Sequence, residues 1–392
     1  MVSGMKELHR SAILSDLLRR RPVSRRDIAT GTGISPATVS RVVEQLILDG
    51  IVREDRELRV ETRGRRPVLL DVVAGRTHVA GVDLGATNTR IVVADLSGRP
   101  LVATRFPTRR EASAEELADW LAHGIETAAR SVWPSVSRVC LGVPGAVRTA
   151  DAVISNAPNL PQVEDPVFLA RLRDRLAKPL SLDNDANYAL LGELHFGAAH
   201  GSSTAAMLTI GTGLGVGLAI DRQVLRGEYG LVGEFGQLPV GPLGARLEHM
   251  VTGPGILRRA EEAGVELADP AELFQLDPLP RIAQLRAQFD QAMLIVLTAA
   301  TVSCEPQCII LGGRVGQSLI ADIDRYRDGL RATLRMAPEI RGARLGDFSG
   351  AAGAVAEGLK HAYRDLGVPV EDLGTLPAAG ALTLSAVEAV TA

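Results

Sequence analysis

The sequence predicts a large α/β protein of two or three domains, and three observations lead to this class. Its 392 residues suggest two or three domains at roughly 150 residues per domain. Hydrophobic residues make up 46% of the chain, and its 40 glycines and 21 prolines are typical of a loop-rich globular α/β protein. Two segments, 79–95 and 205–217, also share a pattern in which an apolar strand enters a glycine turn and a second apolar strand leaves it.

The charge of the chain is unevenly distributed. The net charge is −3, but residues 1–76 hold 15 Lys and Arg against 10 Asp and Glu, which is +5, and the remainder carries −8. A basic N-terminal part on an acidic body indicates that only the N-terminal part meets nucleic acid.

Residues 8–48 have the pattern of a helix, a short helix, a glycine turn and a third helix. Apolar residues recur at helical spacing from Leu8 to Leu18, and Ser24 begins the second helix. A glycine turn at 30–33 follows, and then Ser35 caps a helix with Pro36 at its first position. This is typical of a helix-turn-helix, whose last helix enters the major groove of DNA. A generic three-helix packing module is the alternative.

An extended, cationic section follows the third helix. Alternating Leu58, Val60 and Thr62 fit the wing of a winged helix, and the arginine-rich stretch 63–67 could lie on phosphates or in a minor groove. A solvated charged linker is the competing interpretation. The residues that we expect to meet operator DNA are Ser35, Pro36, Ala37, Thr38, Ser40, Arg41, Arg63, Arg65 and Arg66.

The first glycine turn, within Asp83–Arg90, has the composition of a phosphate-binding loop. Glycine allows backbone N–H groups to approach a phosphate closely, Thr87 adds a hydroxyl, and Asp83 could position a metal-bound water. An ordinary hairpin turn is the alternative. The second turn, 211–217, does not have the glycine spacing of a dinucleotide-binding loop, and a strand rather than a helix follows it. Two such units predict two related lobes with a ligand between them.

A dense group of acids and amides, 183–187, lies where a short strand meets a helix, which is where α/β proteins place binding sites. Either Asp183 merely caps the helix, or Asn184 and Asp185 project into a cleft. The cysteines are too few for a disulfide framework, and Cys304 and Cys308 are interpreted as core residues. No apolar run is long enough for a membrane span, and no signal segment is visible at the N-terminus, so we expect a cytoplasmic protein without a membrane partner.

These motifs together resemble the ROK family (repressors, open reading frames and sugar kinases), and the basic front end resembles the family's transcriptional regulators. The resemblance covers residues 8–366 and implies an actin-like ATPase/hexokinase fold behind a winged helix-turn-helix. The expected domains are 1–67 for the DNA-binding head, 68–184 and 185–366 for the two lobes, and 367–392 for a flexible tail.

The resemblance also implies roles for individual residues. Asp185 matches the position of the catalytic base in the family's kinases and would have that role only in an active kinase. A carboxylate suits the role because it can accept a proton from a sugar hydroxyl. The residues that match sugar-binding positions are Gly145, Asn159, Asn184, Asp185, Glu234, Gln237 and Glu248. Those that match nucleotide-binding positions are Asp83, Gly85, Thr87, Gly211, Thr212, Gly213, Gly312 and Gly313.

One departure from the family concerns zinc. The usual Glu-x-Gly-His appears here as 234–237 with Gln237 at its end, and no cysteine occurs in 238–247. A closed zinc site needs four N or S ligands, so we expect no zinc and no required metal. Gln237 could still hydrogen-bond a sugar hydroxyl.

The leading hypothesis is a sugar-responsive transcriptional regulator, a repressor of carbohydrate uptake or metabolism genes. It would bind operator DNA as a homodimer or homotetramer and take a sugar or sugar phosphate between its lobes. The alternative is an ATP-dependent sugar kinase that carries a DNA-binding head, with ATP and Mg²⁺ as its cofactor. A regulator that binds a nucleotide without turnover depends on the same residues.

Overall fold

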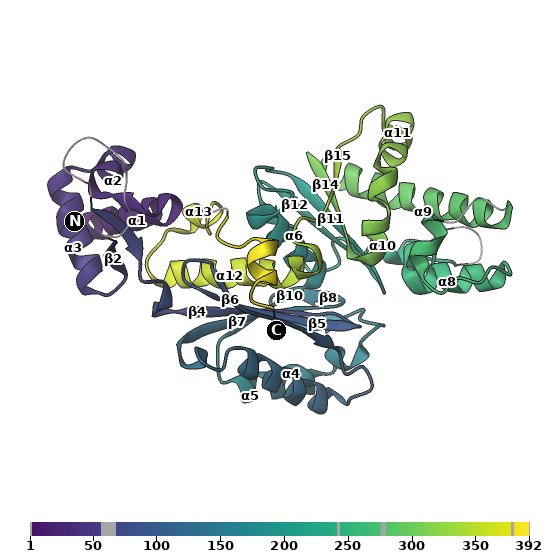
Figure 1. The fold of residues 1–392 in the computed structure, drawn as a ribbon, viewed down its shortest axis with the longest axis horizontal. Coiled ribbons are helices and arrows are strands. Elements are labelled where there is room, and N and C mark those ends of the chain that lie inside the picture. The colour runs from purple at the N-terminus through teal and green to yellow at the C-terminus, as the bar shows by residue number, and fades with distance from the viewer. Residues whose placement is uncertain (1, 56–67, 241–243, 276–279, 378–379, 392) are drawn as a thin grey trace.

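The computed structural model describes residues 2–55, 68–240, 244–275, 280–377 and 380–391. A small head (purple in Figure 1) lies at one end, and a body of two β-sheets extends from it. This arrangement confirms the predicted fold class. Short 3₁₀ helices occupy Ala74–Arg76, Trp133–Ser135, Pro161–Glu164, Phe235–Gln237, Pro270–Phe274, Ile320–Asp322 and Gly346–Phe348.

The head is a three-helix unit with a small antiparallel sheet. Ser24 begins α2 by accepting a hydrogen bond from the backbone N–H of Asp27, and Gly33 ends it with φ at 69°, a conformation that glycine adopts readily. Ser35 caps α3 by accepting from the N–H of Thr38. The elements are α1 (Val2–Arg20), β1 (Val23–Ser24), α2 (Arg25–Thr32), α3 (Pro36–Leu48), β2 (Val52–Asp55) and β3 (Leu69–Val72). The helix-turn-helix prediction is therefore confirmed.

The sheet of the head has the order β1-β3-β2. β3 lies beyond residue 67, the expected end of the head, because its place is decided by pairing with β2, which no local pattern reveals. The predicted wing residues Leu58, Val60 and Thr62, and also Arg63, Arg65 and Arg66, lie outside the described residues.

The first lobe is built on a five-stranded sheet in the order β10-β7-β4-β5-β6. The helices α4 and α5 cover one face of it (Figure 1), and their apolar side chains form one core with Val82, Ile91 and Leu141. The elements are β4 (His78–Leu84), β5 (Asn88–Asp95), β6 (Pro100–Pro107), α4 (Ala114–Ala128), β7 (Val136–Val143), β8 (Ala146–Arg148), β9 (Val153–Ser155), α5 (Pro166–Leu176) and β10 (Leu180–Asn184).

The second lobe has a sheet in the order β13-β12-β11-β14-β15. Alternate residues of β11 belong to different cores: Met207 faces the middle of the molecule, whereas Leu208 packs with Phe289 of α9. The elements are β11 (Ala205–Ile210), β12 (Leu214–Ile220), β13 (Gln223–Val224), α7 (Leu247–Val251), α8 (Gly253–Glu262), α9 (Pro280–Cys304), β14 (Cys308–Gly312), α10 (Gly313–Ser318), α11 (Ile323–Leu334) and β15 (Glu339–Gly342). By length and composition α9 could cross a membrane, but one of its faces lies in this core.

Two central helices, α6 (Asp185–Phe196) and α12 (Ser349–Asp365), lie between the two sheets. They touch backbone to backbone, because a Cβ at Gly353 would lie 1.7 Å from the carbonyl oxygen of Tyr188, and a Cβ at Gly192 would lie 2.3 Å from that of Ser349. α12 also packs on the first sheet, where a Cβ at Gly81 would lie 2.2 Å from the carbonyl oxygen of Ala351. The first sheet, α6 and α12 therefore form one closely packed unit.

The tail differs from the expectation of a flexible end. It contains α13 (Val370–Leu373) and α14 (Leu384–Glu388). Leu376, Leu382 and Val387 are fully buried, and the N–H of Ala103 on β6 donates to the carbonyl oxygen of Val390 at 3.1 Å. Isolated apolar residues in a segment rich in Pro, Gly and Ala have no detectable period, so their burial against the body could not be seen in the sequence.

The head is attached to the end of α12 by helix α1. Arg10 Nη1 donates to the carbonyl oxygen of Leu366 at 2.6 Å, and Ser11 Oγ donates to that of Gly367 at 2.6 Å. Ile13, Leu14 and Leu17 of α1 belong to the same continuous core as α12. The head thus lies on the body through direct contacts and not only through its chain connection.

The tail also joins the head to the second lobe. Arg19 of α1 forms an ion pair with Asp372 and donates to Thr375 Oγ1 at 3.1 Å. Between Asp372 and Thr375, the carbonyl oxygen of Gly374 accepts a hydrogen bond from Arg222 Nε at 3.1 Å, and Arg222 belongs to the β12–β13 turn. Residues 366–375 therefore contact the head on one side and the second lobe on the other.

Candidate functional site

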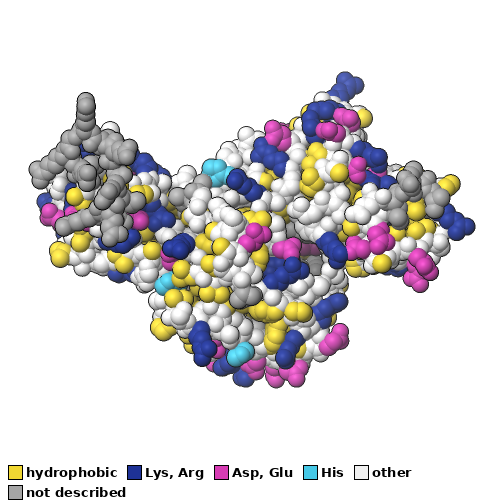
Figure 2. Space-filling model, in the orientation of Figure 1, with side chains coloured by type: hydrophobic (Ala, Val, Ile, Leu, Met, Phe, Trp, Pro, Cys, Tyr) yellow, Lys and Arg dark blue, Asp and Glu magenta, His cyan; other side chains and the backbone are white. Residues whose placement is uncertain are grey.

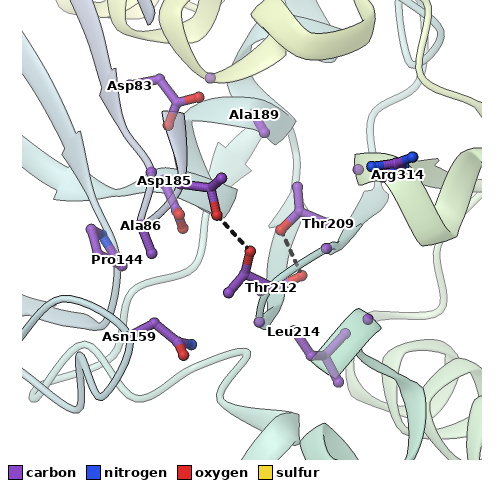
Figure 3. Close-up of a pocket in the computed structure, with 18 of the residues that line it drawn as sticks. Asp83, Ala86, Pro144, Asn159, Asp185, Ala189, Thr209, Thr212, Leu214 and Arg314 are labelled. Atoms are coloured by element: carbon purple, nitrogen blue, oxygen red, sulfur yellow. Dashed lines mark hydrogen bonds between the residues drawn. The ribbon is translucent and has the colours of Figure 1, made fainter. Parts of the chain in front are cut away.

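A cavity of about 760 Å³ opens between the two lobes. Both sheets and both central helices contribute to its walls, and Figure 3 shows Asp83 and Asp185 on one side and Thr209 and Thr212 on the other. The expected site residues that line it are Asp83, Gly85, Thr87, Gly145, Asn159, Asn184, Asp185, Gly211, Thr212, Gly213, Glu234, Gln237, Glu248 and Gly313. The fold therefore brings these residues, which were expected from the sequence, together in one cavity.

The turn between β4 and β5 forms one wall. The N–H of Gly85 donates to the carbonyl oxygen of Asn88 at 3.1 Å, which closes the turn. The hydroxyl of Thr87 is 2.9 Å from that of Thr212, and this hydrogen bond joins the first glycine loop to the second across the cavity (Figure 3). The two loops that were expected to flank a phosphate are thus in direct contact.

The second loop, between β11 and β12, brings other groups together. A Cβ at Gly213 would lie 3.2 Å from both Asn159 Nδ2 and Glu248 Oε1, so glycine leaves room for both side chains beside the loop. A Cβ at Gly211 would meet nothing within 4 Å. This loop therefore leaves open space beside its backbone, as a bound group would require.

Gly312 is the expected nucleotide-binding residue that does not line the cavity. It ends β14, and a Cβ there would lie 2.4 Å from Met207 Cε, inside the core. Its neighbour Gly313 does line the cavity, with φ at 73° and no room for a side chain against Ile210. Gly312 therefore allows close packing in the core, and Gly313 allows the backbone to line the cavity.

The residues at the start of α6 show which of the two interpretations is correct, a helix cap at Asp183 or a cleft lined by Asn184 and Asp185. The cap of α6 is Asn184, whose Oδ1 accepts from the N–H groups of Ala186 and Asn187, and Asn184 Nδ2 donates to the carbonyl oxygen of Gly145 at 2.8 Å. Asp183 is buried and does not cap the helix. It pairs instead with Arg226 at 2.7 Å. Asn184 and Asp185 line the cavity, and the amide of Asn184 is already engaged.

Three carboxyl groups in the cavity, those of Asp83, Asp185 and Glu234, have raised pKa values, and burial is the largest cause at Asp83. Burial, and then the nearby Asp83 carboxylate, raise the pKa of Asp185 to about 8. Burial, and then the neighbouring Glu248, raise the pKa of Glu234 to about 7. Close carboxyl groups away from water favour the protonated form. At neutral pH Asp185 is therefore mainly protonated and can donate as well as accept hydrogen bonds.

The raised pKa of Asp185 predicts a pH-dependent stability. Its pKa is ~3.9 in an unfolded chain, so between about pH 4 and pH 8 the folded state binds more protons than the unfolded state, and stability falls as the pH rises through this window. Asp185→Asn removes the charge and should raise the free energy of unfolding by about 2 kcal/mol at pH 9 and by little at pH 4. Urea denaturation at both values measures this. Glu262→Gln is the exposed control, and equal effects of Asp185→Asn at the two pH values would contradict the prediction.

An arginine and aspartate network beside Asp83 was not anticipated from the sequence. Arg90 Nη1 lies 3.3 Å from Asp83 Oδ2, and Arg90 also pairs with Asp347 at 3.5 Å, to which Arg105 pairs at 2.8 Å. A third cavity arginine, Arg314, pairs with Asp269. Arg90 lies two strand positions beyond Asn88, on the alternating run that the sequence did show. Asp347 is distant in sequence, so its approach depends on the fold.

Gln237 is held by an arginine. Its Oε1 accepts a hydrogen bond from Arg246, and the N–H of Leu247 donates to the carbonyl oxygen of Leu238 at 3.0 Å. These contacts join the two ends of the segment 237–247, of which the structure does not describe 241–243. Among the described residues, no group of three or more His, Cys, Asp or Glu side chains is arranged to hold a metal ion.

The third helix of the head presents a row of side chains to solvent. Ser35, Pro36, Ala37 and Arg41 are exposed, whereas Thr38 and Ser40 are partly buried. Ser35 Oγ lies 3.0 Å from Thr38 Oγ1, so these two hydroxyls are engaged in the helix cap. On the opposite face Val39, Val43 and Leu46 are buried in the head. Arg41 is thus the long cationic side chain of α3 that points away from the core.

A winged helix-turn-helix in front of two lobes with paired glycine loops defines the class: a DNA-binding head on a hexokinase-like body. The chain belongs to the ROK family. The model of that family matches residues 79–359, and a model described as "Winged helix-turn-helix DNA-binding" matches residues 9–53.

Curated relatives carry names of regulators. The chain is 29% identical to a "Putative xylose repressor" of Caldicellulosiruptor sp. over 60% of this chain and 59% of that protein. It is 27% identical to the "DNA-binding transcriptional dual regulator NagC" of Escherichia coli over 62% and 60%, and 26% identical to the "Xylose repressor" of Bacillus subtilis over 80% and 84%. The chain therefore spans about three fifths of the length of the first two of these relatives.

Solved structures show the same fold. A ROK hexokinase from Thermus thermophilus is 34% identical, with a TM-score of 0.59 over 71% of this chain and 97% of that one. A ROK family transcriptional regulator, described as a homologue of the Escherichia coli MLC protein, has a TM-score of 0.73 over 94% and 99%, at 18% identity. The second match includes the head as well as the body, and it supports the fold alone.

Proposed function

We propose that this protein is a sugar-responsive, DNA-binding transcriptional repressor of carbohydrate uptake or metabolism genes. The head would bind operator DNA through α3, and a sugar or sugar phosphate would bind between the lobes. A homodimer or homotetramer would place two heads on repeated half-sites. The protein would act in the cytoplasm, where DNA and sugars meet.

The observation that carries this proposal is the position of α12. Ser349 and Gly350 in its first turn line the cavity, and the end of the helix, at Leu366, is held by Arg10 of the head. A ligand that prefers one arrangement of the lobes can therefore change the position of the head through a single helix. Such a change needs unequal affinity of the ligand for the two arrangements. The names of the repressors among the relatives agree with this function.

The test is a gel shift with DNA upstream of the protein's own gene and of neighbouring genes, with and without a panel of sugars. Arg41→Ala is expected to weaken operator binding about 5- to 150-fold, because a lost base contact costs about 1–3 kcal/mol. Arg130→Ala is the matched control, because Arg130 is exposed in the turn that follows α4. Unchanged binding by the Arg41 variant, or no specific shift with any fragment, would argue against the proposal.

A second candidate function, an ATP-dependent sugar kinase with a DNA-binding head, is favoured by one observation. Asp185 and both glycine loops line the same cavity, and the backbone of Gly211 has open space beside it. Bound ATP with Mg²⁺ would supply a transferable phosphoryl group. Asp185 would have to accept a proton from the sugar hydroxyl, but its raised pKa keeps it mainly protonated at neutral pH. Turnover with ATP, Mg²⁺ and sugars at ~1–100 per second would establish the kinase instead.

A further inference from the structure

A second hollow lies between the last turns of α8 and the first turns of α9, at the end of the molecule opposite the head (Figure 1). Its volume is about 500 Å³, which is within the range of small-molecule sites, roughly 300–1,000 Å³. The described residues that line it are separate from those that line the cleft between the lobes. Its polar lining residues are Arg259, Glu262, Arg281, Gln284 and Gln288.

The two arginines of this hollow form no ion pair with an Asp or Glu in the described part of the chain. By contrast Arg286, further along α9, pairs with Asp290 at 2.9 Å. Burial lowers the pKa of Arg259, and the Glu262 carboxylate offsets this effect only in part. A guanidinium stays charged in proteins, so Arg259 has lost water without gaining a carboxylate partner.

The guanidinium groups of the hollow come from two different helices. A Cβ at Gly264, just past the end of α8, would lie 3.1 Å from Arg281 Nη1, so Arg281 reaches across from α9 to α8. Arg259 Nη2 donates to Gln288 Oε1, which leaves the NH₂ group of Gln288 as a further donor. The forked donors of arginine match the oxygens of a phosphate group, and a phosphate ester carries about −1.5 to −2 charges at pH 7. Two cations and an amide donor are thus present in one hollow for such a dianion.

A generally basic surface does not account for this arrangement. Figure 2 shows acidic side chains beside basic ones over this end of the second lobe. Glu262 also lines the hollow, but it pairs with Arg258 at 3.9 Å, and the two side chains are 68% and 52% exposed. Water and salt screen charges that are exposed in this way. Attraction for an anion must therefore come from the two arginines inside the hollow.

Helix α8 borders the cleft between the lobes as well as this hollow. Gly253, Pro254 and Leu257 of its first turns line the cleft. The N–H of Gly253 donates to the carbonyl oxygen of Gly211, on the second glycine loop, at 2.8 Å. Arg259 lies in the last turns of the same helix. A ligand that fixes one end of α8 can therefore change the affinity of the cleft at the other end, provided that it binds two positions of the helix unequally.

We propose that the hollow between α8 and α9 is a second ligand site, which binds a small phosphate ester through Arg259 and Arg281 and is coupled to the cleft through α8. The phosphate accepts hydrogen bonds from both guanidinium groups and from the amides of Gln284 and Gln288. The site itself is independent of the proposed function, whereas its coupling to sugar binding rests on that function.

The experiment is isothermal titration of the full-length protein at constant ionic strength, because salt screens such contacts. The probes are glucose 6-phosphate, fructose 1,6-bisphosphate and AMP, and inorganic phosphate and sulfate are titrated separately. We expect at least one ester to bind, and Arg281→Gln to weaken it about tenfold, because a charge-assisted hydrogen bond from an exposed side chain is lost. Arg258→Gln is the matched control. Arg258 is a neighbouring arginine that does not line the hollow, so its replacement should change the affinity less than about twofold.

Three results would overturn the inference. An ester that binds the Arg281→Gln protein as tightly as the parent protein would be held elsewhere, for example in the cleft. Failure of every ester to bind would leave the hollow without a ligand of this class. Esters that bind no more tightly than sulfate would show that the arginines attract anions without forming a specific site.

Glu262→Gln gives a result that a damaged fold cannot imitate. Removing the carboxylate beside the two arginines should tighten binding of the ester about twofold or more, because a repulsive charge at the rim is lost. Unchanged or weaker binding in a folded Glu262→Gln protein would show that the charge of the hollow does not select the ligand.

The coupling is measured by titrating a sugar that binds, with the ester absent and then saturating. The sugar affinity of the parent protein should change about 5–150-fold, and that of the Arg281→Gln protein should not change at the same ester concentration. An unchanged sugar affinity in the parent protein would overturn the coupling and leave the site. If no sugar binds, the proposed function fails together with the coupling, whereas the ester titrations still decide whether the site exists.

Discussion

Gly353→Ala is expected to lower the free energy of unfolding by at least about 3 kcal/mol. The added Cβ would lie 1.7 Å from the carbonyl oxygen of Tyr188 and 2.8 Å from the N–H nitrogen of Gly192. Both neighbours are backbone atoms of α6, so no side-chain rotation can relieve the overlap and the two helices must separate. Overpacking of this kind costs typically 1–3 kcal/mol and sometimes more. Urea denaturation followed by circular dichroism measures the loss.

Gly75→Ala is the control for this variant. Gly75 is exposed in a short 3₁₀ helix, and a Cβ there would meet nothing within 4 Å. We expect its free energy of unfolding to stay within about 0.5 kcal/mol of the parent protein. If Gly353→Ala were as stable as this control, α6 and α12 could not be packed backbone to backbone.

Arg222→Ala is expected to disconnect the sugar response from DNA binding. Arg222 donates to the carbonyl oxygens of Gly374, Ser202 and Leu194 at 3.1–3.3 Å, so it joins the tail to the second lobe and to the end of α6. Coupling between two sites typically changes an affinity 5–150-fold. In the variant, the ratio of operator Kd values with and without sugar should approach one. Fluorescence anisotropy with labelled operator DNA measures that ratio.

The matched control is Arg258→Ala, which removes an arginine of α8 that pairs only at 3.9 Å with exposed Glu262. Sugar affinity and sugar-free operator affinity of the Arg222 variant should remain within threefold of the parent values, because neither binding surface contains Arg222. A full sugar response in a folded Arg222 variant would mean that the second lobe does not communicate with the head through residues 366–375.

Local chemistry explains what the sequence could predict. Serine caps, Pro36 and the positive φ at Gly33 are decided within a few residues, so the helix-turn-helix was visible in the sequence. The two glycine turns were visible for the same reason. Thr87 and Thr212, 125 residues apart, meet only because both sheets place their turns at the cavity, which the repeated strand–turn–strand pattern had indicated.

Other features depend on distant partners and could not be predicted in this way. Asp183 precedes a helix, as a cap would, but Arg226 on the other lobe pairs with it and leaves the cap to Asn184. Asp347 joins Arg90 across 257 residues of chain. The tail contains single apolar residues whose burial requires the finished body. In each case the deciding contact lies far along the chain, where pattern and propensity carry no information.

The attachment of the head to residues 366–375 has a consequence for biosynthesis. The head is complete once β3, which ends at Val72, has been made, whereas Asp372 and Thr375 are about 300 residues further along the chain. At a translation rate of ~5–20 residues per second, roughly 15–60 s would pass between completion of the head and synthesis of the residues that it contacts on the body. Until then the head could bind DNA without any connection to the cleft, so a new molecule would respond to sugar only after residues 366–375 have left the ribosome.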